Sequence, residues 1–348
     1  MPSCTSFEPT GRKFMAPDKE NLRNPFLFVV GCPRSGTTLL QRMLDNHHLL
    51  GVANDTHFIP RCLEKFAPHL VGRAIAGEAV PLTEELVAGV RSYRRFGRLG
   101  LGDADVEEAE RRSGSYSEFV TVLYDRFARR VDKPLVGEKT PDYVRRLPLL
   151  HGLFPEARVI HIVRDGRDVT LSALDWSGGT KGPGKMELWK TEPLAVCALW
   201  WRWQVRLGRD AADMLGPARY IEVRYEELVE NPESTLRRLS AFLGLSYSAE
   251  MLTYYVGKER SEPGLSAKSA WLPPTLGLRD WRTQMTERDV GLFDALAGDL
   301  LEELGLERPT VNVSPETTQV ASYCRSWWAA MLARREAKAT RRVRAAMG

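Results

Sequence analysis

The stretch of residues 26–40 restricts the possible fold of this chain more than any other part of the sequence. Residues 26–30 are apolar and carry no charge, a pattern typical of a buried strand in a parallel sheet. A short loop follows, and apolar residues then recur at helical spacing from Leu39 to Leu44. A strand, a tight loop and a helix in this order predict a phosphate-binding site, because the N–H groups of the loop and the positive end of the helix dipole face the same anion.

The residues of this loop suit an anionic ligand. Gly36 allows a ligand to approach the backbone closely, and Arg34 supplies a fixed positive charge. The hydroxyl groups of Ser35, Thr37 and Thr38 can donate hydrogen bonds to phosphate oxygens. We therefore predict that the loop and the first turn of the helix bind a phosphate group.

The loop differs from that of a nucleoside triphosphatase. The spacing from Gly31 to Gly36 fits the Walker A form, but Thr37 occupies the position of its lysine. The cation lies inside the loop instead, at Arg34. A P-loop kinase would also need acidic metal ligands at a strand end, whereas the strand at 158–163 is followed first by an arginine. These differences disfavour a kinase.

Strand-like and helical segments alternate along the chain. Further strands are predicted at residues 49–53, at the start of 135–141, at 158–163 and at 219–223. This alternation predicts an α/β fold: a P-loop-type, doubly wound parallel sheet flanked by helices.

The chain is interpreted as one domain with two extensions. Residues 1–24 are expected to form a flexible leader, and residues 25–310 the domain itself. Within the domain, residues 61–130 are predicted to be a helical insertion that serves as a lid or binds the acceptor substrate. Residues 311–348 are predicted to form a basic helical extension. This extension is either a solvated terminal helix or an amphipathic helix that rests on an anionic membrane or a partner.

Composition excludes several classes of protein. The net charge of +4 is too small to argue for nucleic acid binding. No stretch has the length of an apolar membrane span, and the N-terminal residues lack the apolar run of a signal peptide. The five cysteines are odd in number and form no CxxC pair, so we expect a reduced, metal-free protein in the cytoplasm.

Four motifs resemble those of the sulfotransferases that use 3′-phosphoadenosine 5′-phosphosulfate as donor. The likeness is greatest to bacterial members similar to the Golgi-type and protein-tyrosine sulfotransferase branch. The motifs occur in the family's order, at residues 33–39, at 163–168 with Ser172, at 225–232 and at 278–282. The donor carries a 5′-phosphosulfate and a separate 3′-phosphate, so such a protein needs two anion sites.

The resemblance implies which residues bind the donor. Those expected at the 5′-phosphosulfate are Arg34, Ser35, Gly36, Thr37 and Thr38. Those expected at the 3′-phosphate and the rest of the nucleotide are Arg164, Ser172, Tyr225, Arg279 and Arg282.

The resemblance also implies catalytic roles. Asp55 occupies the place of a glutamate base in the related protein-tyrosine enzymes, one methylene shorter, and His57 is the rival base. We favour Asp55. Arg34 and Lys139 are expected to stabilise the charge of the leaving phosphate, and Ser266 to contact the transferring group.

The predicted function is transfer of a sulfuryl group from this donor to a hydroxyl or amine acceptor by in-line displacement, with no metal. The acceptor stays open among a peptide tyrosine, a carbohydrate, a lipid and a small metabolite, and the oligomeric state is not predicted. The alternatives are a non-catalytic nucleotide-binding protein of the same fold and, third, a P-loop kinase.

Overall fold

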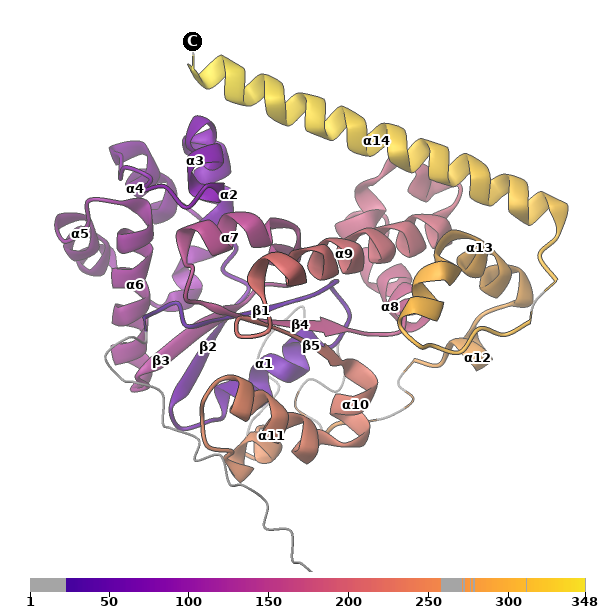
Figure 1. Cartoon of the computed structure of the whole chain (residues 1–348), viewed down its shortest axis with the longest axis horizontal. Helices are drawn as coiled ribbons and strands as arrows, with labels where there is room; N and C mark the ends of the chain where they lie inside the picture. Colours follow the sequence, from indigo (N-terminus) through magenta and orange to yellow (C-terminus); the bar gives the residue numbers. More distant parts are fainter. Residues whose placement is uncertain are drawn as a thin grey trace, which may run out of the picture.

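A five-stranded parallel sheet lies at the centre of the molecule (Figure 1). The computed structural model describes residues 23–257, 271, 273–275, 277, 279–310 and 312–347. Residues 1–22 of the predicted leader and the candidate residue Ser266 lie outside the described residues. The strand order is β2-β3-β1-β4-β5. The strands are β1 (Leu27–Val30), β2 (Leu50–Asn54), β3 (Leu135–Lys139), β4 (Arg158–Val163) and β5 (Tyr220–Arg224).

Alternating side chains of β1 bury both faces of the sheet. Leu27 and Val29 belong to a cluster with helices α1 (Thr37–Asp45), α10 (Tyr225–Glu230) and α11 (Pro232–Phe242). Phe28 and Val30 belong to a second cluster on the opposite face. Helices α7 (Leu147–Leu153) and α9 (Pro193–Leu215) contribute to that cluster. Helices therefore cover both faces, which confirms the predicted doubly wound sheet (Figure 1).

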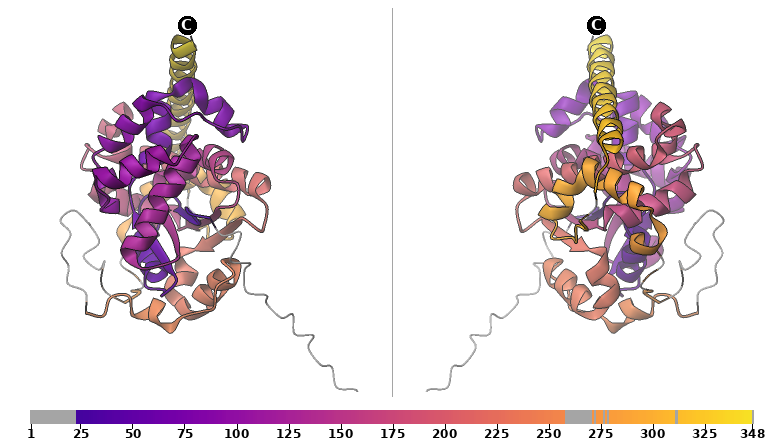
Figure 2. Two further views of the ribbon diagram at one scale, coloured as in Figure 1. Left: turned by 90° about the vertical axis from the view of Figure 1, so that its left-hand side faces the viewer. Right: turned by 90° about the vertical axis from the view of Figure 1, so that its right-hand side faces the viewer.

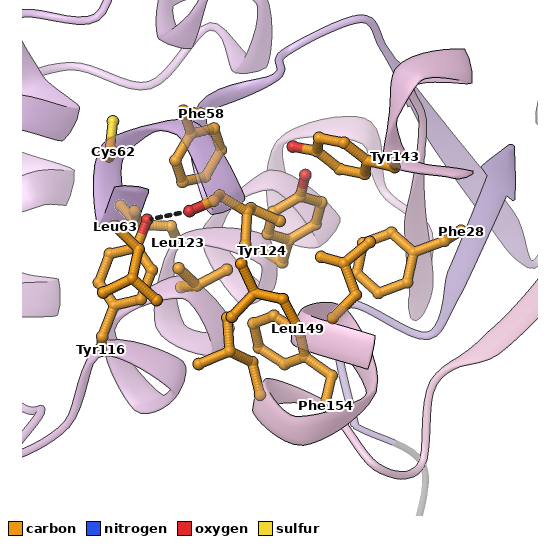
Figure 3. Close-up of a cluster of buried hydrophobic side chains, with 14 of the residues drawn as sticks. Phe28, Phe58, Cys62, Leu63, Tyr116, Leu123, Tyr124, Tyr143, Leu149 and Phe154 are labelled. Carbon is orange, nitrogen blue, oxygen red and sulfur yellow. Dashed lines mark hydrogen bonds between the residues drawn. The ribbon is translucent and has the colours of Figure 1, made fainter. Parts of the chain in front are cut away.

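The segment between β2 and β3 is helical, as predicted. Its buried aromatic side chains pack in the same cluster as Phe28 of β1 (Figure 3). The hydroxyl of Tyr116 donates to the carbonyl oxygen of Ile59 over 2.8 Å and ties two of these helices together. This segment therefore shares the core of the sheet. Its helices are α2 (Phe58–Phe66), α3 (Val71–Ile75), α4 (Glu84–Arg91), α5 (Asp103–Arg111) and α6 (Tyr116–Val131), with short 3₁₀ turns η2 (Pro68–Leu70) and η3 (Phe96–Leu99).

A third cluster joins the long helix α9 to three others. These are α8 (Gly166–Ser177), α13 (Glu287–Glu303) and α14 (Pro315–Met347), and the short α12 (Trp281–Gln284) lies beside α8. Trp200 and Trp201 are buried in this cluster. Trp203 meets Trp328 edge-on, with ring centroids 6.2 Å apart. These tryptophans are core and helix-packing residues.

Helix α14 crosses one side of the molecule (Figures 1 and 2). Ala321, Cys324 and Trp328 in its first half are buried against the third cluster. The helix also contacts η2 in the segment between β2 and β3. Its basic side chains lie further along and are exposed: Arg334, Arg335, Lys338, Arg341, Arg342 and Arg344. Within the described residues, no helix is both long and apolar enough to cross a bilayer.

Candidate active site

The predicted phosphate loop connects β1 to α1 in the expected geometry. Gly36 has φ 87° and directly precedes the helix. A Cβ atom at Gly36 would lie 2.3 Å from Cδ2 of Tyr225, so only glycine fits against this ring. The hydroxyl oxygen of Ser35 is buried and has no hydrogen-bond partner among the described residues. Such a group can donate to an anion held in the loop.

Arg34 reaches from the loop to the helix after β4. Its Nε donates to Oγ of Ser172 over 2.9 Å. Burial, and next the positive charges of Arg164 and Arg279, lower the pKa of Arg34 to about 10. A bound anion would offset both effects, because it would pair with a cluster of cations that now repel one another.

Arg164 lies at the carboxyl end of β4, beside Arg34. Its guanidinium stacks on the ring of Tyr225 with the Cζ atom 4.3 Å from the centroid. One nitrogen donates to Oδ2 of Asp168 over 3.2 Å. The Nε of Arg164 is buried and has no partner within the described part of the chain. The structure thus brings Arg34, Ser172, Arg164 and Tyr225 together.

Asp55 and Lys139 meet at the ends of the neighbouring strands β2 and β3. Lys139 is buried, and its Nζ lies 3.2 Å from Oδ1 of Asp55. The same nitrogen donates to Oγ1 of Thr38, also over 3.2 Å. Burial lowers the pKa of Lys139, and the charge of Asp55 opposes that shift. Thr38 belongs to the first turn of α1, so Lys139 connects the candidate base to the phosphate loop.

His57 lies near Asp55 but in a different chemical state. Its Nε2 is 4.0 Å from Oδ1 of Asp55. Burial lowers the pKa of His57 to about 4, although the charge of Asp55 acts in the opposite direction. The imidazole is therefore neutral at physiological pH. Burial thus removes the usual advantage of an imidazole over a carboxylate as a base, which is a pKa nearer to neutrality.

Backbone strain concentrates in this site. Positive φ angles occur at Arg34 (83°), Asp55 (55°) and His57 (63°). Residues with a Cβ adopt this conformation rarely, and it persists where the surroundings impose it. The pattern of residue types did not predict these angles.

Glu138 is a residue of the site that the sequence motifs did not single out. It is fully buried, and its carboxylate accepts hydrogen bonds from the loop that carries Asp55. Lys139 pairs with Asp55 and not with Glu138. One feature of the sequence could have identified Glu138. It lies two residues after Val136 in a predicted strand, so alternation places its carboxylate on the same buried face.

Three arginines lie near Asp55 and His57. Arg98, on η3, lies 3.8 Å from Oδ2 of Asp55 and donates to the carbonyl oxygen of Asn54. The charge of Arg95 also lowers the pKa of His57, as does that of Arg61. These three arginines come from the segment between β2 and β3, for which the sequence predicts a role as a lid or in acceptor binding.

The late motif is tied to the 164–168 motif through Trp281. The backbone N–H of Trp281 donates to Oδ1 of Asp168 over 3.1 Å. Its ring lies under the guanidinium of Arg167, 3.6 Å from Cζ to the centroid. Arg167 itself makes a buried bidentate pair with Asp165.

The two arginines predicted in the late motif lie in different places. Arg279 pairs with Asp175 on α8, one turn beyond Ser172, and its charge acts on Arg34. Arg282 is exposed and pairs with Glu307. The structure therefore brings Arg279 close to Arg34 and Arg164, whereas Arg282 packs on Trp281 and pairs with Glu307. No group of three or more potential metal ligands occurs among the residues that the structure describes.

Comparisons with known proteins agree with this geometry. A family model described as the sulfotransferase family matches residues 25–249. Protein-tyrosine sulfotransferase A of Caenorhabditis elegans is 25% identical over 300 residues, which are 85% of this chain and 70% of that protein. Nodulation protein NoeE of Sinorhizobium fredii is 28% identical over 301 residues, 81% of this chain and 66% of that protein. The solved sulfotransferase domain of the Synechococcus PCC 7002 olefin synthase has a TM-score of 0.55 at 22% identity and covers 82% of this chain and 95% of that one.

Proposed function

This chain belongs to the sulfotransferase family, and we propose that it moves a sulfuryl group from 3′-phosphoadenosine 5′-phosphosulfate to a hydroxyl or amine acceptor. The observation that carries the proposal is a pair of buried donor groups, Ser35 Oγ and Arg164 Nε, that lack partners among the described residues. They lie on the two loops where a donor with two anionic ends needs contacts. Buried polar groups are usually paired, so these two fit a ligand that supplies the acceptors.

The residues divide the work of an in-line displacement. Arg34 and the loop hold the 5′-phosphosulfate, and Arg164 with Ser172 holds the 3′-phosphate. The acceptor oxygen forms a bond to sulfur while the bond from sulfur to the 5′-phosphate oxygen breaks, and the electron pair leaves with the phosphate. Asp55 takes the acceptor proton, and the ammonium of Lys139 and the guanidinium of Arg34 stabilise the charge on the leaving oxygen. Positioning and charge stabilisation thus supply most of the catalysis.

The arginines near Asp55 support one class of acceptor. Arg61, Arg95 and Arg98 place positive charge beside the candidate base. An acceptor that carries a negative group close to its reactive hydroxyl would be bound more tightly than a neutral one. A panel of peptide tyrosines, carbohydrates, lipids and small metabolites, each in an anionic and a neutral form, tests this part of the proposal.

The basic end of α14 supports contact with an anionic membrane surface as a further part of the proposal. The basic side chains from residue 334 onward have no acidic partner among the described residues, whereas arginines elsewhere on the surface pair with acids. A cytoplasmic location also stays a proposal. The unpaired, buried thiols of Cys32, Cys62, Cys197 and Cys324 suit a reducing compartment.

Transfer of labelled sulfate from the donor to the acceptor panel is the direct test. We expect labelled product with the wild-type chain and loss of it with Arg34→Ala and with Asp55→Ala. Transfer that survives Arg34→Ala would contradict the proposed anion site. Tight binding of the product nucleotide without turnover on any acceptor would favour the non-catalytic alternative, and magnesium-dependent consumption of ATP would favour a kinase.

A further inference from the structure

A buried carboxylate lies directly behind the loop that carries the candidate base. Glu138 has no exposed surface, and no ion pair to it occurs in the described part of the chain. Burying a charge without a counter-ion is costly unless hydrogen bonds replace the lost water. Six donors do so here: Thr56 N, Thr56 Oγ1, His57 N and Thr140 Oγ1 bind Oε1 at 3.0, 2.6, 3.1 and 2.5 Å, and Tyr124 OH and Tyr143 OH bind Oε2 at 2.5 and 3.2 Å.

The two oxygens of Glu138 serve different parts of the structure. Oε1 accepts hydrogen bonds from the loop after β2. The donors are two successive backbone N–H groups and the hydroxyl of Thr56. Oε2 receives the phenol groups of Tyr124 on α6 and Tyr143 on η4 (Pro141–Arg146). The tyrosines therefore satisfy the oxygen that faces the core, whereas Oε1 alone binds the loop.

The loop needs such a partner because its backbone conformation is unfavourable. Asp55 and His57 both have positive φ angles, on either side of Thr56. This arrangement turns the N–H groups of Thr56 and His57 toward one point, where Oε1 lies, so that the backbone forms a small anion-binding nest. The N–H of Asp55 is held separately by the carbonyl oxygen of Lys139 over 2.7 Å. Three successive N–H groups are thus anchored by residues 138 and 139.

Neighbouring positions on β3 act on the loop from opposite faces of the sheet. Glu138 points into the cluster of α6 and holds the backbone of residues 56 and 57. Lys139 points to the other face, where its Nζ meets Oδ1 of Asp55. The side chain of Asp55 can lie beside this ammonium only while the backbone keeps its left-handed turn.

We infer that Glu138 is a positioning residue for the reaction: its Oε1 holds residues 55–57 in the conformation that directs the Asp55 carboxylate toward Lys139 and the acceptor. The inference rests on the proposed function for the chemical step, but the conformation of the loop can be measured without turnover. Glu138 touches neither Arg34 nor Arg164, so its removal should affect catalysis and leave nucleotide binding intact.

The first experiment compares Glu138→Gln with Tyr124→Phe. Both variants disturb the same buried network. Tyr124→Phe removes a donor to Oε2 but leaves the clamp, which is the set of hydrogen bonds from residues 56 and 57 to Oε1. With labelled donor and the acceptor that the wild-type chain uses best, we expect Glu138→Gln to lower kcat by about 100-fold, because small displacements of a catalytic group have effects of this size. The dissociation constant of 3′-phosphoadenosine 5′-phosphate, measured by calorimetry, should be unchanged. Tyr124→Phe should leave kcat within about threefold of the wild type.

A second measurement follows the loop itself. The ring of His57 can be titrated by NMR, with His57→Gln to assign its signals. In the wild type, burial holds its pKa near 4, with Asp55, Asp142, Arg61 and Arg95 as the charged groups that face it. In Glu138→Gln a neutral amide holds the loop N–H groups less strongly than the carboxylate does, so the loop should open to water more often and this pKa should rise toward the ordinary value of a histidine. In Tyr124→Phe it should stay low.

The outcomes separate the two proposals. A wild-type chain that transfers sulfate to no acceptor would refute the proposed function, and the titration of His57 would still decide on the clamp. An unchanged His57 pKa in Glu138→Gln overturns the inference, and so does a kcat that stays within threefold or falls equally in Tyr124→Phe. If Glu138→Gln does not fold, Thr56→Val removes the hydroxyl bond to Oε1 alone. That variant should lower kcat severalfold at unchanged nucleotide affinity, and an unaltered kcat contradicts the clamp.

Discussion

The ammonium nitrogen of Lys139 lies 3.2 Å from Oδ1 of Asp55, although the two side chains come from different strands and Lys139 has almost no exposed surface. The pair joins the candidate base to the group proposed to stabilise the leaving phosphate. Each ion compensates the charge of the other until substrates enter. Proton abstraction and charge stabilisation should therefore depend on one another.

Replacing the base provides the sharpest test of this pair. Asp55→Asn keeps the shape of the side chain but removes its basicity, so kcat should fall by about 100-fold or more. Nucleotide affinity should change little, because the anion-binding loops do not include this residue. His57→Gln should lower kcat much less, since burial leaves the imidazole without its usual pKa advantage and Asp55 is the residue that pairs with Lys139. Initial rates with labelled donor check both, and a larger loss in His57→Gln would exchange the two roles.

Arg164 should tolerate no exchange for lysine. Its planar guanidinium stacks on Tyr225 and presents to the site an Nε that has no partner among the described residues. An ammonium group can neither stack in this way nor offer a fork of donors, so Arg164→Lys should weaken product-nucleotide binding by about 10-fold or more. Calorimetry measures the change. Arg237→Lys, in an exposed pair with Glu233 on α11, serves as the matched control and should bind like the wild type.

Asp168 should make nucleotide binding depend on pH. Burial raises the pKa of Asp168 to about 6, although Arg164 opposes the shift. Above that pH the carboxylate is charged and competes with a phosphate for Arg164, whereas protonation at lower pH frees the arginine. Asp168→Asn keeps an oxygen for the N–H of Trp281 and should bind 3′-phosphoadenosine 5′-phosphate more tightly than the wild type at pH 7.5. The difference between the two proteins should shrink below about pH 6, and a constant difference would contradict the competition.

His161 should make stability depend on pH. It is fully buried on β4, with Nδ1 2.7 Å from the hydroxyl oxygen of Tyr220, and burial lowers its pKa to about 3. A histidine with a lowered folded pKa stabilises the protein above its unfolded pKa, and this contribution is lost as the pH falls toward the folded value. The free energy of unfolding should therefore decrease between about pH 6.5 and pH 3, by an amount on the order of 4 kcal/mol from this group. Chemical denaturation across this range should show a smaller decrease in His161→Phe.

The basic end of α14 gives a prediction about membranes. The chain should sediment with vesicles that contain phosphatidylserine and not with vesicles of phosphatidylcholine alone. Each cation near an anionic surface contributes about 1 kcal/mol, and added salt should weaken the binding. Arg341→Glu with Arg342→Glu should abolish sedimentation without reducing transfer to a soluble acceptor. Equal sedimentation with both kinds of vesicle would exclude an electrostatic contact.

Much of this architecture follows from local patterns. The apolar run before Gly31 predicted the central strand, because a strand that helices cover on both faces is apolar along its whole length. The proximity of Arg34 and Arg164 could be predicted, since the carboxyl ends of adjacent parallel strands lie at one edge of the sheet. Periodicity could not reveal that Asp55 and His57 have left-handed backbones. That property depends on Glu138, which is distant in sequence and recognisable only once β2 and β3 are paired.

Helix α14 has a consequence for how the protein is made. Its first half covers apolar side chains of α9 and α13 that would otherwise face water. During translation, domains generally fold as units in the order in which they emerge from the ribosome. The sheet and its phosphate loop can assemble early. The apolar surface formed by α8, α9 and α13 stays exposed to water until α14 has been synthesised. Nascent chains of this protein should therefore pass through a stage that needs chaperone protection, with the sheet formed before the apolar surface that α14 covers is closed.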